Sequence, residues 1–246
     1  MGFKSSFKTT SIWEKLFGAG VLFYLAFALF GFWYFDYLPF RDWYDWVLEG
    51  QILAHHSEPR FNPYYQVVKS PVPNSFASFF LYLCSGFLSP EQAGRLWLSL
   101  SFLTFIFGFW YCANRLSGKN SFRYLGLFLV WNHWFLIGNL NQHFGLGIFL
   151  FALGRLCAKE PGFTRQQILE LNLWCLLLYF IHFTVYGAFL IFLFFWLWEK
   201  ERQILKSGFK LIFGAGISLI FLAWFSWKVL SGENLGRLFS WYHPLY

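Results

Sequence analysis

Long apolar segments alternate with short polar joints along the chain, and this pattern predicts membrane-spanning helices. The first apolar segment, residues 16–35, carries no charge over about twenty positions, enough helix to cross about 30 Å of hydrocarbon. Later apolar segments occupy residues 74–88, 93–113, 124–137, 146–157, 168–198 and 209–229. The segment 168–198 is too long for one crossing, so we expect a break near His182. The sequence therefore predicts an all-α, polytopic transmembrane helical bundle of about seven or eight spans.

Two helix starts and one hinge stand out within this pattern. The segment from Asn74 to Leu88 is short for a full crossing, at about fifteen residues, so we expect it to be re-entrant or interfacial. Asn74 is a favourable N-cap for its helix. The next helix should begin at Ser89-Pro90-Glu91, because proline and an acidic residue suit a first turn. Further along, two apolar arms flank a polar hinge from Gly138 to His143.

Basic residues collect in the joints between apolar segments, near positions 119, 160 and 203. Lys4, Lys8 and Lys15 precede the first span. Because lysine and arginine favour the cytoplasmic side, we expect a cytoplasmic N-terminus. The first loop, the polar hinge and the His182 turn then all face the extracytoplasmic side.

Composition agrees with a membrane protein. The chain is 57% hydrophobic and 13% charged, against about 25% charged residues in an ordinary soluble domain. Its net charge of +7 comes from residues between the spans, where they set topology, so we do not expect nucleic-acid binding. The four cysteines lie in or beside apolar segments without CxxC spacing, which indicates core residues. They are Cys84, Cys112, Cys157 and Cys175.

Residues 36–73 form the longest polar stretch, and we expect them to make one extracytoplasmic loop in a single integral membrane domain covering residues 1–246. The stretch contains all three aspartates, the only adjacent histidines and five of the eight prolines. Loops of this length are uncommon and tend to carry function. We therefore expect any chemistry of the protein to lie here.

Apolar and acidic positions separate onto two faces near the start of this loop. Apolar residues recur at helical spacing at Trp43, Trp46 and Val47. Acidic residues recur three and then four positions apart, at Asp42, Asp45 and Glu49. This pattern is typical of an interfacial amphipathic helix whose acidic face looks toward water.

Short motifs follow one another in a definite order between the spans. The first span and the acidic helix lead to NPYY, SPVPN and LSPEQAGRLWLSL. WNHW then leads to GNLN, LGIFLFALGRL and LLLYFIHFTVYGAFL. Over residues 12–200, this order resembles bacterial GT-C type polytopic membrane glycosyltransferases.

The resemblance implies a transferase that takes a sugar from a polyprenyl-phosphate donor at the extracytoplasmic face. It also implies a location in the bacterial cytoplasmic (inner) membrane. Full GT-C enzymes have more spans and often a soluble C-terminal domain, and from this sequence we expect neither. The alternative is therefore a non-catalytic integral membrane subunit that packs within a larger membrane complex.

The resemblance further implies that a loop aspartate acts as general base. Asp42 is the position that matches most naturally, and Asp36, at the end of the first span, is the rival. Asp45 lies three residues after Asp42, so the two would share a helical face and could act together. The alternative is that these acids are only solvated polar residues at the membrane interface.

Other polar residues are candidates for substrate binding. Arg60 and Lys69 flank NPYY and could hold a phosphate, with arginine the better bidentate partner; structural pairing with the loop acids is the alternative. Five polar residues in apolar surroundings should face protein or water, because lipid exposure is costly. They are Asn139, Asn141, Gln142, His143 and His182. They either line the same aqueous vestibule or form hydrogen-bonded connections between helices.

The sequence does not identify a cofactor. A divalent metal ion is the candidate, and His55, His56 and Glu58 could help to bind it. The polarity expected of a loop also explains these residues, so no metal ligand is assigned. The partners that we expect are the lipid bilayer, the lipid-linked sugar donor and, in the alternative, other membrane subunits. A transporter or channel is disfavoured because the charges lie at span ends and not within spans.

Overall fold

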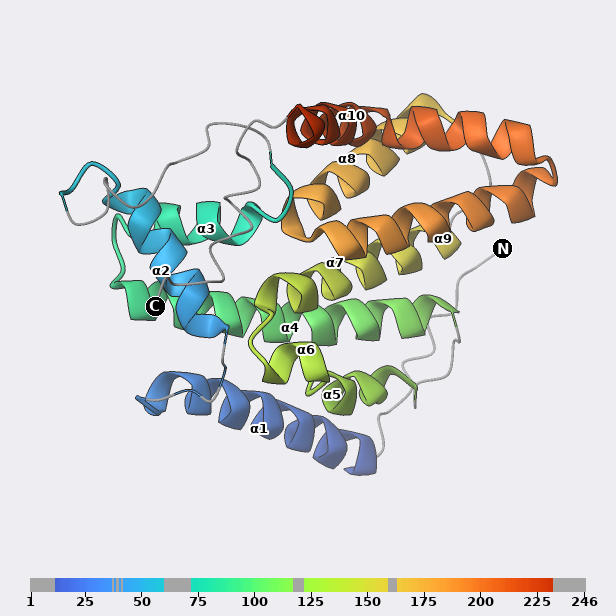
Figure 1. Cartoon of the computed structure of the whole chain (residues 1–246). Coiled ribbons are helices and arrows are strands. Elements are labelled where there is room, and N and C mark those ends of the chain that lie inside the picture. Colours follow the sequence, from blue (N-terminus) through green and yellow to red (C-terminus); the bar gives the residue numbers. More distant parts are fainter. Residues whose placement is uncertain are drawn as a thin grey trace. The chain divides into compact units, whose positions relative to one another are not determined.

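The computed structural model of the chain describes residues 12–36, 38, 40, 42–59, 72–116, 122–158 and 163–231. In these ranges the structure is helical, as predicted, and it contains no strand (Figure 1). The elements are α1 Ile12–Tyr34, α2 Trp43–Ala54, α3 Phe76–Cys84, α4 Pro90–Leu116, the 3₁₀ helix η1 Phe122–Leu125, α5 Gly126–Leu129, α6 His133–Leu136, α7 Leu140–Cys157, α8 Arg165–Ile181, α9 Phe183–Glu201 and α10 Ile204–Leu230.

The chain divides into two compact units, one ending at Leu38 and the other beginning at Pro39. Helix α1 belongs to the first unit, and helices α2 to α10 belong to the second. Among the described candidate residues, Asp36 therefore belongs to the first unit and the others belong to the second.

Four of the described helices are long and apolar enough to cross a membrane. They are Leu16–Tyr34, Pro90–Leu116, Phe183–Glu201 and Ile204–Leu230. Their length and composition support an integral membrane protein. Helices α7 and α8, with 18 and 17 residues, are not among these four. The seven or eight spans expected from the sequence therefore remain a prediction.

The predicted boundaries in the 165–201 region and at Pro90 are confirmed. Helix α8 ends at Ile181, and His182 takes an extended conformation (φ −158°, ψ 118°) before α9 begins. Helix α4 begins at Pro90, where Ser89 and Gln92 exchange side-chain and backbone hydrogen bonds of 3.0 and 3.2 Å. This reciprocal pair is a capping box, which satisfies two backbone N–H groups at the start of the helix.

Helices α4 and α7 lie side by side at the centre of the second unit (Figure 1). A Cβ atom at Gly147 of α7 would lie 2.7 Å from Phe105 N and from Thr104 O of α4. A Cβ atom at Gly154 would lie 2.9 Å from Cys112 Cα. Only glycine permits such close backbone approach, which is a common way for apolar helices to pack in membranes.

Helices α8, α9 and α10 are joined by buried polar contacts as well as by apolar packing. Asn172 of α8 donates to Phe213 O (2.7 Å) and accepts from Ile217 N (3.0 Å), both in α10. Tyr186 of α9 lies 3.0 Å, between hydroxyl oxygens, from Ser218 of α10. Such hydrogen bonds fix the register of helices whose apolar surfaces alone would allow sliding.

The basic joint predicted near position 203 is present, whereas positions 119 and 160 lie outside the described residues. Arg202 ends α9 in a left-handed conformation (φ 55°) and contacts Glu199 at 2.6 Å. Lys206, in the first turn of α10, contacts Glu201 at 2.8 Å. Charged residues thus close the α9–α10 connection, as expected at a membrane surface.

Candidate functional site

Helix α2 is present where the loop pattern predicts a helix, and its apolar face is covered by protein. Trp43, Trp46 and Ile52 are buried. Gly50 faces α3, where an added Cβ would lie 2.6 Å from Leu81 Cβ. On the other side, Val47 and Trp43 pack against Gly94 of α4. The helix is therefore anchored on α3 and α4, and its placement in a membrane interface remains a prediction.

The start of α2 is joined to the polar hinge before α7. Asp42 is the N-cap residue of α2, and its backbone N–H donates to Ile137 O at 2.9 Å. Gly138, the residue after Ile137, has φ +85°, and a Cβ atom there would lie 2.9 Å from Trp43 N. Two segments that are about a hundred residues apart in sequence thus meet at Asp42.

Asp42 is half-buried, and its carboxylate makes no capping hydrogen bond to α2. This is unusual, because an aspartate at this position ordinarily accepts from the first backbone N–H groups of its helix. Asp45, in the first turn, is exposed. Asp36 is also exposed and belongs to the first unit. Arg60 and Lys69 lie outside the described residues.

Glu49 is held differently from Asp42. It is partly buried between α2 and α3, and the Ser78 hydroxyl donates to its carboxylate. Burial raises the pKa of Glu49, and Asp45 adds to the increase, while the hydrogen bond from Ser78 opposes it. Glu49 therefore serves the contact between α2 and α3.

The polar hinge residues do not converge on one point. Asn139 is the N-cap of α7, and its side chain accepts from Gln142 N (3.4 Å) and donates to Gln142 Oε1 (3.1 Å). Asn141 is buried and donates to Asn74 O at 3.3 Å. Successive helical residues point about 100° apart, so neighbours in sequence face different partners. Asn139 and Gln142 are partly buried and lie beside Gly138, close to the start of α2.

His143 lies in the core of the α4–α7 pair. Its Nδ1 is 2.9 Å from Ser101 Oγ, and its Nε2 is 3.1 Å from Val130 O. The ring stacks on Phe105 with 4.7 Å between ring centres. The side chain is fully buried, so its contacts match the hydrogen-bonded helix connection more closely than a vestibule.

Asn74 has a role that the sequence did not reveal. The expected N-cap role for the following helix is wrong, because the N-cap of α3 is Ser75. Asn74 adopts φ +63°, and its Oδ1 accepts from Phe183 N at 2.7 Å, at the start of α9. Its backbone N–H donates to Tyr179 O in α8 at 3.4 Å. Asn74 therefore connects α7, α8 and α9 where the α8–α9 break occurs.

His182, at that break, is partly buried, and its Nδ1 has no hydrogen-bond partner. Asn141 Oδ1 is likewise buried and unpartnered. The two residues are close neighbours of Asn74, because Asn141 donates to its carbonyl and Phe183 to its side chain. The predicted residues Asn141 and His182 thus both lie beside Asn74.

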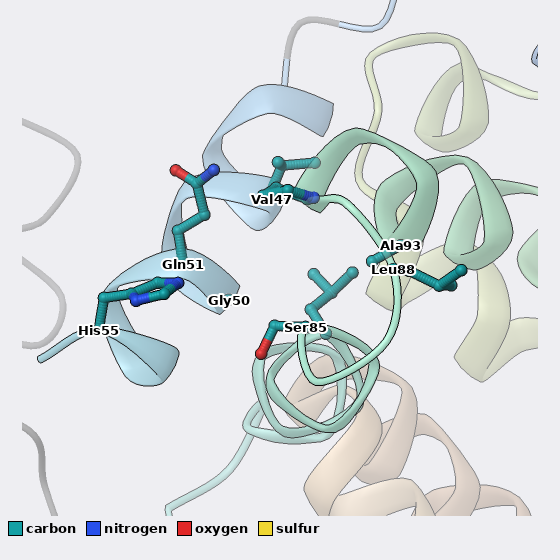
Figure 2. A pocket seen from close by; sticks show the side chains of 9 residues that line it. Val47, Gly50, Gln51, His55, Ser85, Leu88 and Ala93 are labelled. Atoms are coloured by element: carbon teal, nitrogen blue, oxygen red, sulfur yellow. The ribbon is translucent and has the colours of Figure 1, made fainter.

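A pocket lies at the other end of α2, between α2, α3 and the start of α4 (Figure 2). Gln51 and His55 contribute from α2 and its C-cap, and Ser85 faces them from the end of α3. His55 Nδ1 lies 2.7 Å from Glu58 Oε1. Sequence reasoning named His55 and Glu58 but had no signal for Ser85, because the pocket depends on how three helices pack.

The described residues contain no group of three or more histidine, cysteine, aspartate or glutamate side chains that could hold a metal ion. The same residues include all four cysteines, and each is a free thiol. None of the described residues is therefore assigned to a metal.

Known proteins offer no further guide to the site. The chain matches no protein-family model, no curated protein and no solved structure.

Proposed function

We propose that this chain is a GT-C-like membrane glycosyltransferase, with Asp42 as its general base. The observation that carries the proposal is Asp42 itself, a half-buried residue whose carboxylate makes no capping hydrogen bond and whose backbone contacts Ile137 and Gly138. The proposed reaction moves a sugar from a polyprenyl-phosphate donor to an acceptor hydroxyl at the extracytoplasmic face.

A base in such a transfer must lie within hydrogen-bond reach of the acceptor hydroxyl while the donor phosphate departs. Asp42 suits this role better than Glu49 or Glu58, whose carboxylates already bind Ser78 and His55. Asn139 and Gln142, beside Gly138, would bind sugar hydroxyls. Arg60 and Lys69 would bind the phosphate, and Asp36 remains the rival base.

The proposal includes the fuller topology. Helix α7, with 18 residues, and α8, with 17, are about 25 to 27 Å long and could add crossings to the four apolar helices. The N-terminus would lie in the cytoplasm, and the loop that contains α2 would lie outside a bacterial inner membrane. In that arrangement Asp42 faces the compartment in which lipid-linked sugars are presented.

A non-catalytic membrane subunit is the second candidate, and one observation favours it. Helix α10 exposes large apolar side chains along its length, among them Leu205, Phe209 and Ile220 at 80%, 64% and 68%. In a membrane these side chains face lipid or a neighbouring subunit.

The two candidates are separated by an activity measurement on the purified full chain in liposomes. A labelled sugar on polyprenyl phosphate is supplied with total membrane lipids as acceptors, and transfer to a new lipid is followed by chromatography. Transfer that depends on added protein supports the enzyme. No transfer, together with stoichiometric copurification of other membrane proteins from cells, would replace it with the subunit.

A further inference from the structure

Three basic side chains lie where α4, α7 and α9 end, at one end of the second unit. They are Arg115, Arg155 and Lys200, each in the last turn of its helix. The three helices run in the same direction (Figure 1). A Cβ atom at Gly154 of α7 would lie 2.9 Å from Cys112 Cα of α4, so the last turns of these two helices are in close contact. We call Arg115, Arg155 and Lys200 the basic patch.

Tyr111 of α4 connects the two arginines of the basic patch. The guanidinium carbon of Arg115 lies 5.3 Å from the centre of the Tyr111 ring, which is a cation–π contact. The same tyrosine interacts with Arg155 of α7. Lys200 of α9 interacts electrostatically with Cys157, two residues after Arg155. The three positive charges therefore come from three helices but belong to one surface.

Acidic side chains offset the charge of this patch only in part. Arg155 Nε lies 3.1 Å from Glu170 Oε1. Within the described ranges, neither Arg115 nor Lys200 forms an ion pair, and both residues are exposed. An anion from outside can therefore reach both side chains. A phosphate suits this place, because arginine presents a fork of N–H donors that matches phosphate oxygens.

Apolar side chains of α4 are exposed beside Arg115. Phe107 and Trp110 precede it and are 48% and 43% exposed, and Leu116 follows it at 56%. Residues four apart share a helical face, so Phe107, Tyr111 and Arg115 form one stripe that ends in positive charge. A phospholipid with an anionic headgroup matches both parts of this stripe, whereas a soluble phosphate would match only the charge.

We propose that the basic patch binds the phosphate of an anionic phospholipid, whose acyl chains lie along Phe107 and Trp110. Basic residues at the ends of spans attract anionic headgroups in the same way. This binding goes beyond the proposed sugar transfer and does not depend on it. Asp42 contacts the segment before α7, whereas Arg155 is in the last turn of that helix, which is about 27 Å long.

Lipid titration of the purified full chain in detergent tests this site, with bound lipids counted by native mass spectrometry. The probes are dioleoyl phosphatidylglycerol, which is anionic, and dioleoyl phosphatidylcholine, which has the same chains but no net charge. We expect the first phosphatidylglycerol to bind about tenfold more tightly than phosphatidylcholine. Glycerophosphoglycerol, the free headgroup without chains, should not displace it even in large excess.

Arg115→Gln should weaken the binding of phosphatidylglycerol about tenfold. Lys206→Gln is the matched control, because it removes the same charge from the α9–α10 connection, where Lys206 already contacts Glu201 at 2.8 Å. Its affinity should stay within about twofold of wild type.

Size-exclusion chromatography checks that both variants fold. If Arg115→Gln does not fold, the two lipids and the free headgroup decide on the unchanged chain. Equal affinity for the two lipids, equal weakening by the two substitutions, or displacement by glycerophosphoglycerol would overturn the proposal.

Discussion

The backbone conformation of Gly138 holds its segment close to Asp42, the proposed base. The φ of +85° at Gly138 is costly for any residue with a Cβ, and that Cβ would also lie 3.0 Å from Asp42 N. We expect Gly138→Ala to lower the free energy of unfolding by about 1–3 kcal/mol. Thermal unfolding in detergent measures this change. Gly208→Ala is the control, since no atom lies within 4 Å of its added Cβ; equal midpoints for both variants would contradict the expectation.

Glu49 gives the contact between α2 and α3 a pH dependence. Burial raises its pKa in the folded protein, so the folded state holds the proton more tightly than the unfolded state. The contribution of Glu49 to stability should therefore be highest below the unfolded pKa, about 4.3, and be lost as pH rises through the raised folded pKa.

We expect Glu49→Gln to remove this fall, because glutamine is uncharged and can still accept from Ser78. Chemical unfolding of both proteins across the acidic-to-neutral range measures it. Glu91→Gln, at an exposed position, is the control. Identical pH profiles for wild type and Glu49→Gln would refute this role for Glu49.

Among elements, the α8–α9 break depends on a side chain from outside both helices. Asn74→Gly keeps the positive φ but removes the acceptor for Phe183 N, at a cost of about 1 kcal/mol. Asn74→Ala adds the strain of a Cβ at positive φ, about 1 kcal/mol more. Unfolding midpoints should therefore fall in the order wild type, Asn74→Gly, Asn74→Ala. If Asn74→Gly matched wild type, the cap would not stabilise α9.

The α4–α7 pair should be the element contact least tolerant of added volume. Gly147→Ala would place a methyl group against α4 backbone atoms, which cannot rotate away, and should cost about 1–3 kcal/mol or more. Gly187→Ala in α9 is the matched control, because its Cβ would meet no atom within 4 Å and alanine favours helix. Thermal stability of the two variants in one detergent compares them. A Gly147→Ala variant as stable as Gly187→Ala would show that the helices can separate freely there.

Sequence patterns predicted where helices begin and end better than they predicted which residues contact one another. The break at His182 and the start at Pro90 follow from local signals: a segment too long for one crossing, and a proline in a first turn. Asn74 shows what local signals cannot predict. Its hydrogen-bond partner Phe183 lies 109 residues further along the chain. A favourable N-cap residue does not identify the helix that it caps.

The same limit applies to the candidate site. Ser101 meets His143 across 42 residues, and no local pattern marks that pair. Gly147 and Gly187 both lie in apolar helices, yet only the packing shows that Gly147 lies against the α4 backbone and Gly187 is surrounded by space. The polar hinge was recognised as a unit, but the helical turn of about 100° per residue sends its members to different neighbours.

For the whole molecule, four apolar helices support an integral membrane protein, and the proposed chemistry depends on which carboxylate acts. Asp42 and Asp36 belong to different compact units, so they are separable by mutation. Glu91→Gln serves as the matched control, because Glu91 is exposed in the first turn of α4 and has no proposed role in the reaction.

The decisive measurement is the initial rate of sugar transfer from a polyprenyl-phosphate donor by wild type, Asp42→Asn, Asp36→Asn and Glu91→Gln, at equal protein level in membranes. We expect Asp42→Asn to lower the rate about 100- to 10,000-fold, the usual contribution of a general base. Glu91→Gln should keep the wild-type rate. An Asp42→Asn protein that transfers sugar as fast as wild type would contradict the assignment, and a loss confined to Asp36→Asn would move the base to Asp36.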